Sequence, residues 1–294
     1  MAADLHCHTK LSNGSLGIDN LVVLAKKRGI ATIAITDHDC LAGNVRGKII
    51  GERYGVNVIP GVEISATDRK RGVRADILCY LPDSPDRLEG LCRNNLLIRK
   101  KASQYMMLSV ASRFPVTMDF MAACASGSTG VYKQHIMHAL MEAGMTNEIY
   151  GDLYRELFSS DSPDNILRET LYPDPSEVLK AIHDAGGIAV MAHPVLFNNY
   201  ELLDELIGLG LDGIEVWHPS CDEEDIVYLQ QKAKKHNLLM TGGSDFHGMY
   251  GYNKTTIGSA TMPDDRLDAL MSYKSRRRRQ KARMASESNN DENN

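Results

Sequence analysis

Two histidines two residues apart stand near the start of the chain, in the segment DLHCHT at residues 4–9. In an extended strand, side chains two residues apart project from the same face. His6 and His8 are therefore expected to point one way together with Asp4, and Leu5 and Cys7 the other way. Neutral imidazole is a favoured ligand for zinc, iron, manganese or nickel. This segment predicts half of a metal site, provided that partners lie at other strand ends.

Residues of the same kinds recur at the ends of other predicted strands, namely His38, Glu63, His193, Asp245 and His247. Asp245 and His247 repeat the spacing of the first pair. Each of these residues alone also fits a structural role in a polar turn. Gathered at one end of one fold, seven imidazoles and carboxylates would be mutually costly without cations. We therefore expect a multinuclear metal site rather than a structural polar cluster.

The elements that must position these residues alternate along the chain. Amphipathic helices are predicted at 17–29, about 43–54, 176–185 with Ser176 as its N-cap, 201–209 and 222–236. Strands are predicted at 30–36, 56–65, 76–80, 186–194, 213–219 and 238–247, and residues 66–74 are expected to form a charged turn. Nearly continuous apolar strands are typical of parallel sheets covered on both faces. The pattern predicts a barrel-like α/β fold with its active site at the carboxyl ends of the strands.

Two segments depart from this alternation. Residues 82–171 are predicted to form a helical insertion or lid, which leaves 1–81 and 172–266 for the barrel. Residues 267–294 are basic, at 276–279, 281 and 283, and then rich in Ser, Asn, Asp and Glu. Low hydrophobicity there predicts a frayed tail. The basic run is expected to be a solvated helix end, with contact to phosphate or nucleic acid as the alternative.

The composition limits the class of protein. The 294 residues are 43 % hydrophobic and 24 % charged, which suits one large domain with an insertion. The net charge of −5 does not suggest a protein that coats nucleic acid. We see no apolar run of membrane-spanning length and no signal peptide. The six cysteines are scattered and never form Cys-x-x-Cys, so we expect reduced, mostly buried thiols in a cytoplasmic protein, and a cysteine ligand is less favoured.

The motifs at 4–9, 36–39, 60–65, 192–194 and 244–247 resemble, in order and spacing, those of the PHP (polymerase and histidinol phosphatase) phosphoesterase family. The resemblance covers about 1–80 and 172–260. It implies a distorted seven-stranded β/α barrel that holds two or three divalent ions, manganese, iron or zinc. The implied ligands are His6, His8, Glu63 and Asp245 for one metal, Glu63, His193 and Asp76 for a second, and His38, His247 and Asn13 for a third.

Two of these positions differ from the usual family pattern. Asn13 stands where the family usually has aspartate, and a neutral amide is a weaker ligand, which puts the third metal in doubt. Asp76 stands where a histidine is usual. Its carboxylate adds negative charge and favours manganese or iron over zinc.

The resemblance implies hydrolysis of phosphate monoesters or cyclic diesters of nucleotides or sugar phosphates. A hydroxide bridging two metals would be the nucleophile, and the metals would neutralise the phosphoryl oxygens. His218 is our candidate acid for the leaving group, with His193 and Asp245 as rivals. A capping or packing role for His218 is equally open, and Glu215 stays unassigned.

Three residues of the insertion are candidates for binding the substrate phosphate. Lys133 and His135 belong to the segment KQHI at 133–136, which resembles the RPHI of small stand-alone members that act on nucleotides and cyclic sugar phosphates. Arg99 could bind phosphate with two hydrogen bonds, or could lie on a solvated helix face. A 5′-to-3′ exonuclease and a non-catalytic module are the alternatives. We expect a small phosphorylated substrate, and neither a membrane nor long nucleic acid as a partner.

Overall fold

The computed structural model describes residues 2–252 and 255–291, and its strands form one seven-stranded sheet in chain order. The strands are β1 Ala2–Cys7, β2 Ile30–Ile35, β3 Asn57–Asp68, β4 Val73–Tyr80, β5 Ile188–Met191, β6 Gly213–Trp217 and β7 Leu239–Gly242. The last strand returns to the first: the His8 N–H donates to the Phe246 carbonyl at 2.9 Å, and the Phe246 N–H to the His6 carbonyl at 3.2 Å. The predicted distorted seven-stranded α/β barrel is thereby confirmed.

Five helices cover the outside of this barrel: α1 Ile18–Lys27, α2 Asn44–Tyr54, α7 Pro175–Asp184, α8 Tyr200–Gly208 and α9 Glu223–Lys235. Each turns an apolar stripe inward, as Val178, Leu179 and Ile182 of α7 do. Asp174, and not the predicted Ser176, caps α7. The Asp174 carboxylate accepts the backbone N–H of Ser176 at 2.9 Å. Aspartate one residue before Pro175 is well placed for this, because proline needs no hydrogen-bond partner for its nitrogen.

The middle of the sheet departs from the predicted parallel pattern. β4 runs antiparallel to both β3 and β5, whereas the other paired strands are parallel. The charged turn predicted at 66–74 is wrong in extent, because β3 continues to Asp68 and β4 begins at Val73. Arg71 in this hairpin pairs with Asp68 at 2.6 Å and with Glu205 of α8 at 2.7 Å. The reversal brings the first half of β4 to the barrel end where the parallel strands finish.

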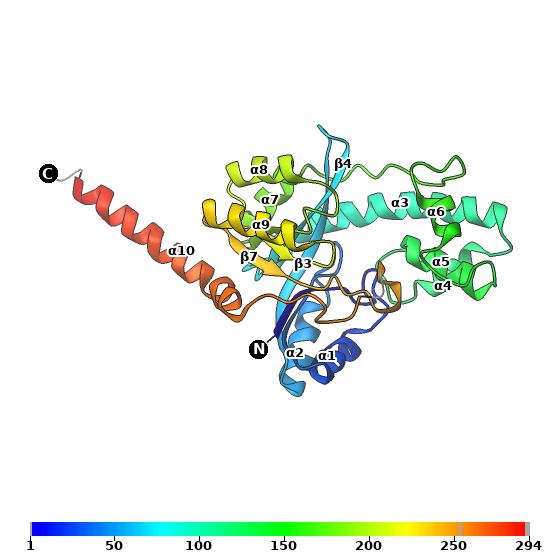
Figure 1. Ribbon diagram of the computed structural model, residues 1–294, viewed down its shortest axis with the longest axis horizontal. Coiled ribbons are helices and arrows are strands. Elements are labelled where there is room, and N and C mark those ends of the chain that lie inside the picture. The colour runs from blue at the N-terminus through cyan, green and yellow to red at the C-terminus, as the bar shows by residue number, and fades with distance from the viewer. Residues whose placement is uncertain (1, 253–254, 292–294) are drawn as a thin grey trace.

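The segment between β4 and α7 folds into η1 Pro85–Leu88, α3 Glu89–Arg113, α4 Met118–Cys124, α5 Lys133–Glu142 and α6 Asp152–Phe158. These helices gather on one side of the barrel, on the right of Figure 1. They have an apolar core of their own, which includes Met121, Ile136 and Leu140. The turn after α4 binds the loop after β1, where the Thr129 N–H donates to the Leu11 carbonyl at 2.9 Å. The insertion therefore lies beside the carboxyl ends of the strands.

The chain does not fray after residue 267 as predicted, because α10 Asp264–Asp291 is a helix that projects from the body (Figure 1). Its first turns are docked: Leu270 is fully buried, and the Tyr273 hydroxyl and the Arg277 guanidinium each donate to Asp212 at 2.7 Å. Lys281 and Arg283 lie outside the residues whose side chains are described. An apolar stripe of few residues escaped a prediction based on mean composition.

A short helix, η2 Gly248–Tyr250, follows β7. Within the described helices, none has the length and the apolar character needed to cross a membrane.

Candidate active site

Glu63 of β3 lies at the centre of a cluster of buried imidazoles. Its Oε2 is 3.0 Å from His38 Nδ1, 3.2 Å from His8 Nε2 and 3.5 Å from His6 Nε2. Its Oε1 is 2.9 Å from His193 Nε2. The four histidines come from the ends of β1, β2 and β5, so the barrel end gathers side chains that are up to 187 positions apart in the chain, from His6 to His193.

A second carboxylate, Asp245, approaches the cluster from the end of β7. Its Oδ1 is 3.4 Å from His6 Nε2 and 3.2 Å from His8 Nε2, and its Oδ2 is 3.7 Å from His218 Nε2. Asp245 has a φ of +50° and His193 a φ of +27°. Residues other than glycine rarely adopt positive φ, which costs about 1–3 kcal/mol, and such residues concentrate at functional sites.

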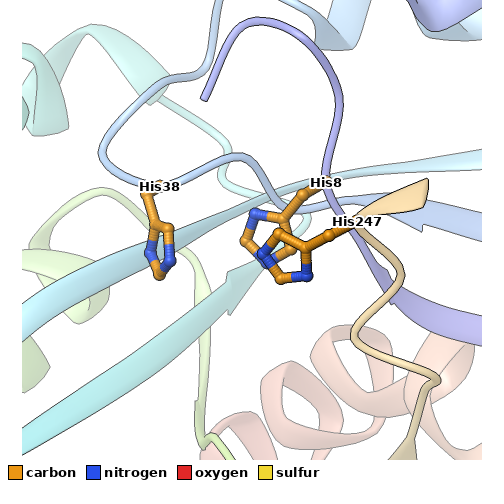
Figure 2. Close-up of side chains that lie close together, drawn as sticks. All are labelled: His8, His38 and His247. Atoms are coloured by element: carbon orange, nitrogen blue, oxygen red, sulfur yellow. The ribbon is translucent and has the colours of Figure 1, made fainter. Parts of the chain in front are cut away.

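Three imidazoles from separate strand ends meet beside this pair of carboxylates. Figure 2 shows His8, His38 and His247 together, with the rings of His8 and His247 stacked. Their ring centroids are 4.2 Å apart, and those of His8 and His38 are 4.7 Å apart. Asn13 lines the same pocket, and its Oδ1 accepts the Ser12 hydroxyl at 3.2 Å.

The Nδ1 atoms of two of these histidines face hydrogen-bond acceptors. His6 Nδ1 is 3.0 Å from Glu215 Oε1, and His247 Nδ1 donates to the Asp245 carbonyl oxygen at 2.7 Å. A carbonyl or an ionised carboxylate can only accept, so the proton stays on Nδ1 and the Nε2 lone pair is free to bind a metal. Sequence reasoning left Glu215 without a role; its place on β6, two residues before the end of the strand, was the available signal.

His8 is oriented in the same way by a short relay. The Ser12 hydroxyl donates to Asp37 Oδ1 at 2.6 Å and lies 3.3 Å from His8 Nδ1, so its oxygen can accept the proton on that nitrogen. Asp37 also accepts the Thr9 hydroxyl at 2.6 Å. The loop after β1 therefore holds the third Nε2 toward the cluster.

Asp4 does not join His6 and His8 in the cluster, although strand alternation put all three on one face. Its carboxylate accepts the Ser244 N–H at 2.9 Å and hydroxyl at 2.5 Å, and the Gly258 N–H at 2.7 Å. The pairing of β1 with β2 is irregular between Asp4 and Cys7. A side chain on Gly243 would overlap the backbone of His6. Asp4 and Gly243 thus join β7 to β1.

The donor set fits divalent metal ions. Four groups have all their ligand atoms within 4.8 Å of one another, and they are His8–His38–His247, His6–Glu63–His193, His6–His8–Asp245 and His38–Glu63–Asp76. Nε2 of His6, Nε2 of His8 and Oε2 of Glu63 are buried and have no hydrogen-bond partner within the described part of the chain. Buried polar atoms rarely stay unpaired. Imidazole nitrogens with carboxylate oxygens suit zinc, iron and manganese.

The groups differ in part from the sets implied by the family resemblance. Asp76 groups with His38 and Glu63, whereas the resemblance joined it to His193. His8 joins the His38–His247 group in which Asn13 was expected. The assignment of individual ligands to individual metals remains a prediction.

The carboxylates also change the acidity of the imidazoles. Burial lowers the pKa of His6, but the charges of Glu215, Glu63 and Asp245 outweigh burial and raise this pKa well above its usual value. Hydrogen bonds to Asp245 and Glu63 likewise overcome burial and raise the pKa of His8 to about 9. Without metal the site therefore holds protons that divalent ions would replace.

A pocket of about 360 Å³ opens over the cluster. Its volume is at the lower end of the range for small-molecule sites. Its wall includes residues that sequence reasoning did not single out, namely Arg74, Gln134, Tyr150, Tyr154, Phe197 and Tyr252.

The proposed substrate residues of the insertion lie outside the described lining of this pocket. Arg99 is 12 % exposed, and its Nη2 donates to Asp39 at 2.9 Å. His135 is buried, and its Nδ1 accepts the Tyr132 N–H at 3.1 Å. Their roles in substrate binding therefore stay predictions, as does that of Lys133, whose ammonium lies 5.7 Å from the ring centre of Phe158.

Comparisons with known proteins agree with this geometry. The family model described as PHP domain matches residues 4–209. A phosphoribosyl 1,2-cyclic phosphate 1,2-diphosphodiesterase of Eggerthella lenta is 35% identical over 254 residues, which cover 85% of this chain and 96% of the relative. A 5′-3′ exoribonuclease of Haemophilus influenzae is 28% identical, over 85% of this chain and 91% of the relative. A structure from Bifidobacterium adolescentis, named as a candidate metal-dependent phosphoesterase, is 32% identical with a TM-score of 0.83, over 92% of this chain and 95% of that one. The chain therefore belongs to the PHP domain family and is a metal-dependent phosphoesterase.

Proposed function

We propose that this phosphoesterase acts on a small phosphorylated sugar or nucleotide, and that a five-membered cyclic phosphate of ribose is its preferred class of substrate. The observation that carries the proposal is the buried cluster of imidazoles and carboxylates beneath a pocket of about 360 Å³. The name of the Eggerthella lenta relative, which matches over nearly its whole length, supports the choice of a cyclic phosphate.

The cluster would hold two or three divalent ions, with manganese or iron favoured because Asp76 adds an oxygen ligand. His6, His8, Glu63 and Asp245 would hold the first ion, and Glu63 would be shared with a second. When bound, such ions supply a water of lowered pKa and positive charge against the phosphoryl oxygens. The task of this chain is to present these nitrogens in the right tautomer and to exclude bulk water.

His218 has a hydrogen-bonding pattern that suits contact with the phosphate group. Its Nδ1 accepts the Ser220 N–H at 3.1 Å, so the proton of the neutral ring resides on Nε2. That Nε2 is buried, lines the pocket wall and has no hydrogen-bond partner among the described residues. We infer that His218 donates from Nε2 to a phosphoryl or leaving oxygen. Its role as a full proton donor, and those of His193 and Asp245 as rivals, remain part of the proposal.

The alternative is a 5′-to-3′ exonuclease on short oligonucleotides, the activity in the name of the Haemophilus influenzae relative. The small pocket and the net charge of −5 favour the small-molecule substrate. A cytoplasmic protein with no long nucleic acid as partner completes the proposal.

The test compares kcat/KM of the manganese-loaded protein on three substrates: 5-phosphoribose 1,2-cyclic phosphate, a nucleoside 3′,5′-bisphosphate and a 5′-phosphorylated trinucleotide. We expect the cyclic phosphate to exceed the other two by at least ~10-fold. Phosphorus NMR then shows which ester bond opens. The E63Q variant serves as the control without a central ligand and should lose most of the activity.

Two outcomes would overturn the proposal. A preference for the trinucleotide would establish the exonuclease alternative. Failure of the loaded protein to hydrolyse any of the three substrates, despite bound metal, would exclude this class of substrate.

A further inference from the structure

Arg74 supplies a guanidinium to the pocket wall that none of the predictions above had used. It lies on β4, two residues before Asp76, and its side chain is 40 % exposed. Arg74 Nε is 2.9 Å from Asp76 Oδ2, and Nη2 donates to Asp76 Oδ1 at 3.2 Å. The guanidinium also lies 5.6 Å from the ring centre of Phe197. Two contacts with one carboxylate and an aromatic ring hold its plane, and further N–H groups stay available to a ligand.

The carboxylate that orients Arg74 belongs to the cluster. Asp76 is buried and groups with His38 and Glu63 within 4.8 Å. Arg74, His38, Glu63 and Asp76 line the same pocket. An anion bound at the guanidinium would therefore lie one side chain away from the place where the phosphate ester is hydrolysed.

A second cation lies near Arg74. Burial, followed by the positive charges of Arg74 and Arg99, lowers the pKa of Lys133 to about 8. Tyr154 shares the wall, and the charge of Arg74 partly offsets the rise in its pKa that burial causes. Cations gathered at a partly enclosed wall repel one another, and a bound anion would relieve that repulsion.

We propose that Arg74, oriented by Asp76, binds a second phosphate of the substrate, one that is not hydrolysed while the first is at the cluster. A planar guanidinium can donate two parallel hydrogen bonds to a phosphate monoester. The inference rests on the proposed function, and it narrows the substrate class to small molecules with two phosphate groups. The pocket of about 360 Å³ would hold both phosphates on one sugar.

The test uses ribose 1,2-cyclic phosphate with and without a 5-phosphate. For the wild type we expect kcat/KM to be ~100-fold higher with the 5-phosphate, the size of one or two charge-assisted hydrogen bonds. In R74M that ratio should fall below ~10, and in R74K it should be intermediate, because lysine keeps the charge without the fork. R46M is the matched control. Arg46 pairs with Asp19 on the exposed surface of α1 and α2, so this variant should keep the wild-type ratio.

Binding without turnover separates this inference from the proposed function. Calorimetry on manganese-loaded protein should show ribose 5-phosphate binding at least ~30-fold more tightly than ribose, with the difference lost in R74M. This result can be obtained even if no cyclic phosphate is hydrolysed. Equal losses by R74M on both cyclic substrates would overturn the inference, because Arg74 would then serve the scissile phosphate. A lower metal content in R74M would also overturn it, because Arg74 would then act only through Asp76.

Discussion

Glu215 and His6 are 209 positions apart in the chain, yet Glu215 Oε1 lies 3.0 Å from His6 Nδ1 at the floor of the active site. The other oxygen of Glu215 accepts the His193 N–H at 2.9 Å. One buried carboxylate thus orients the ring of one predicted ligand and the backbone of another. Such partners of metal-binding histidines commonly change metal affinity when removed.

The E215Q variant should bind manganese about 10- to 100-fold more weakly than the wild type, because the amide no longer provides two charged acceptors. Isothermal calorimetry on metal-free protein measures this directly. E205Q is the matched control, since Glu205 pairs with Arg71 and Lys70 on the surface and should leave the metal affinity unchanged. Unchanged affinity in E215Q, in a folded protein, would show that the contact with His6 has only a packing role.

Removal of metal should lower the melting temperature. A ligand that binds only the folded state stabilises it by about 4 kcal/mol at 1,000 times its Kd, which is roughly 10 °C for a chain of this size. Scanning calorimetry with manganese and then with a chelator measures the shift. E63Q lacks the carboxylate shared by His6, His8, His38 and His193, so its shift should be much smaller. Equal shifts in the two proteins would contradict the assignment of Glu63 to the metal.

Replacement of Asn13 by aspartate should strengthen the weakest metal site. Asn13 lines the pocket with His38 and His247, and its amide oxygen is neutral. A carboxylate at this position would add an anionic ligand beside the three imidazoles of Figure 2. N13D should therefore bind the last metal at least ~10-fold more tightly, as measured by mass spectrometry of metal content during titration. The same stoichiometry and affinity as the wild type would place Asn13 outside the ligand set.

Loss of the Asp212 carboxylate should weaken the docking of α10. Asp212 accepts hydrogen bonds from Tyr273, Arg277 and His183 at 2.7, 2.7 and 2.9 Å. D212N should lower the free energy of unfolding by about 2 kcal/mol in urea titrations at pH 7. The control is D204N, because Asp204 pairs with Lys232 on the surface and should change stability by less than about 0.5 kcal/mol.

The pH dependence of this difference has a definite sign. Burial raises the pKa of Asp212, but hydrogen bonds from His183, Ala189 N–H and Tyr273 outweigh burial, so its pKa is lowered in the folded protein. The stabilisation is therefore complete above the unfolded value of about 3.9 and is lost as the pH falls through the lower folded value. The two proteins should converge below about pH 4. A difference that instead grows on acidification would rule out this role for the Asp212 charge.

The amino-acid sequence by itself determined the class of fold and the chemistry of the site. Alternating helices and apolar strands predicted the barrel, and histidines and carboxylates at strand ends predicted where a metal would bind. These features are local: strand parity and strand ends can be recognised within about ten residues. The Ser176 cap, the extent of the 66–74 turn and the frayed tail failed because a single neighbouring residue or a docked apolar stripe decided each of them.

Only the tertiary structure decided which of these groups meet. Asp4 has the right strand parity for the cluster but closes the barrel with Ser244, and Glu215, which had no assigned role, orients His6. Arg99 is held by Asp39, while Arg74 reaches the pocket because β4 runs antiparallel to its neighbours. Contacts between residues far apart in the chain depend on strand direction, stagger and packing summed over the whole barrel, and no short stretch of sequence carries that sum.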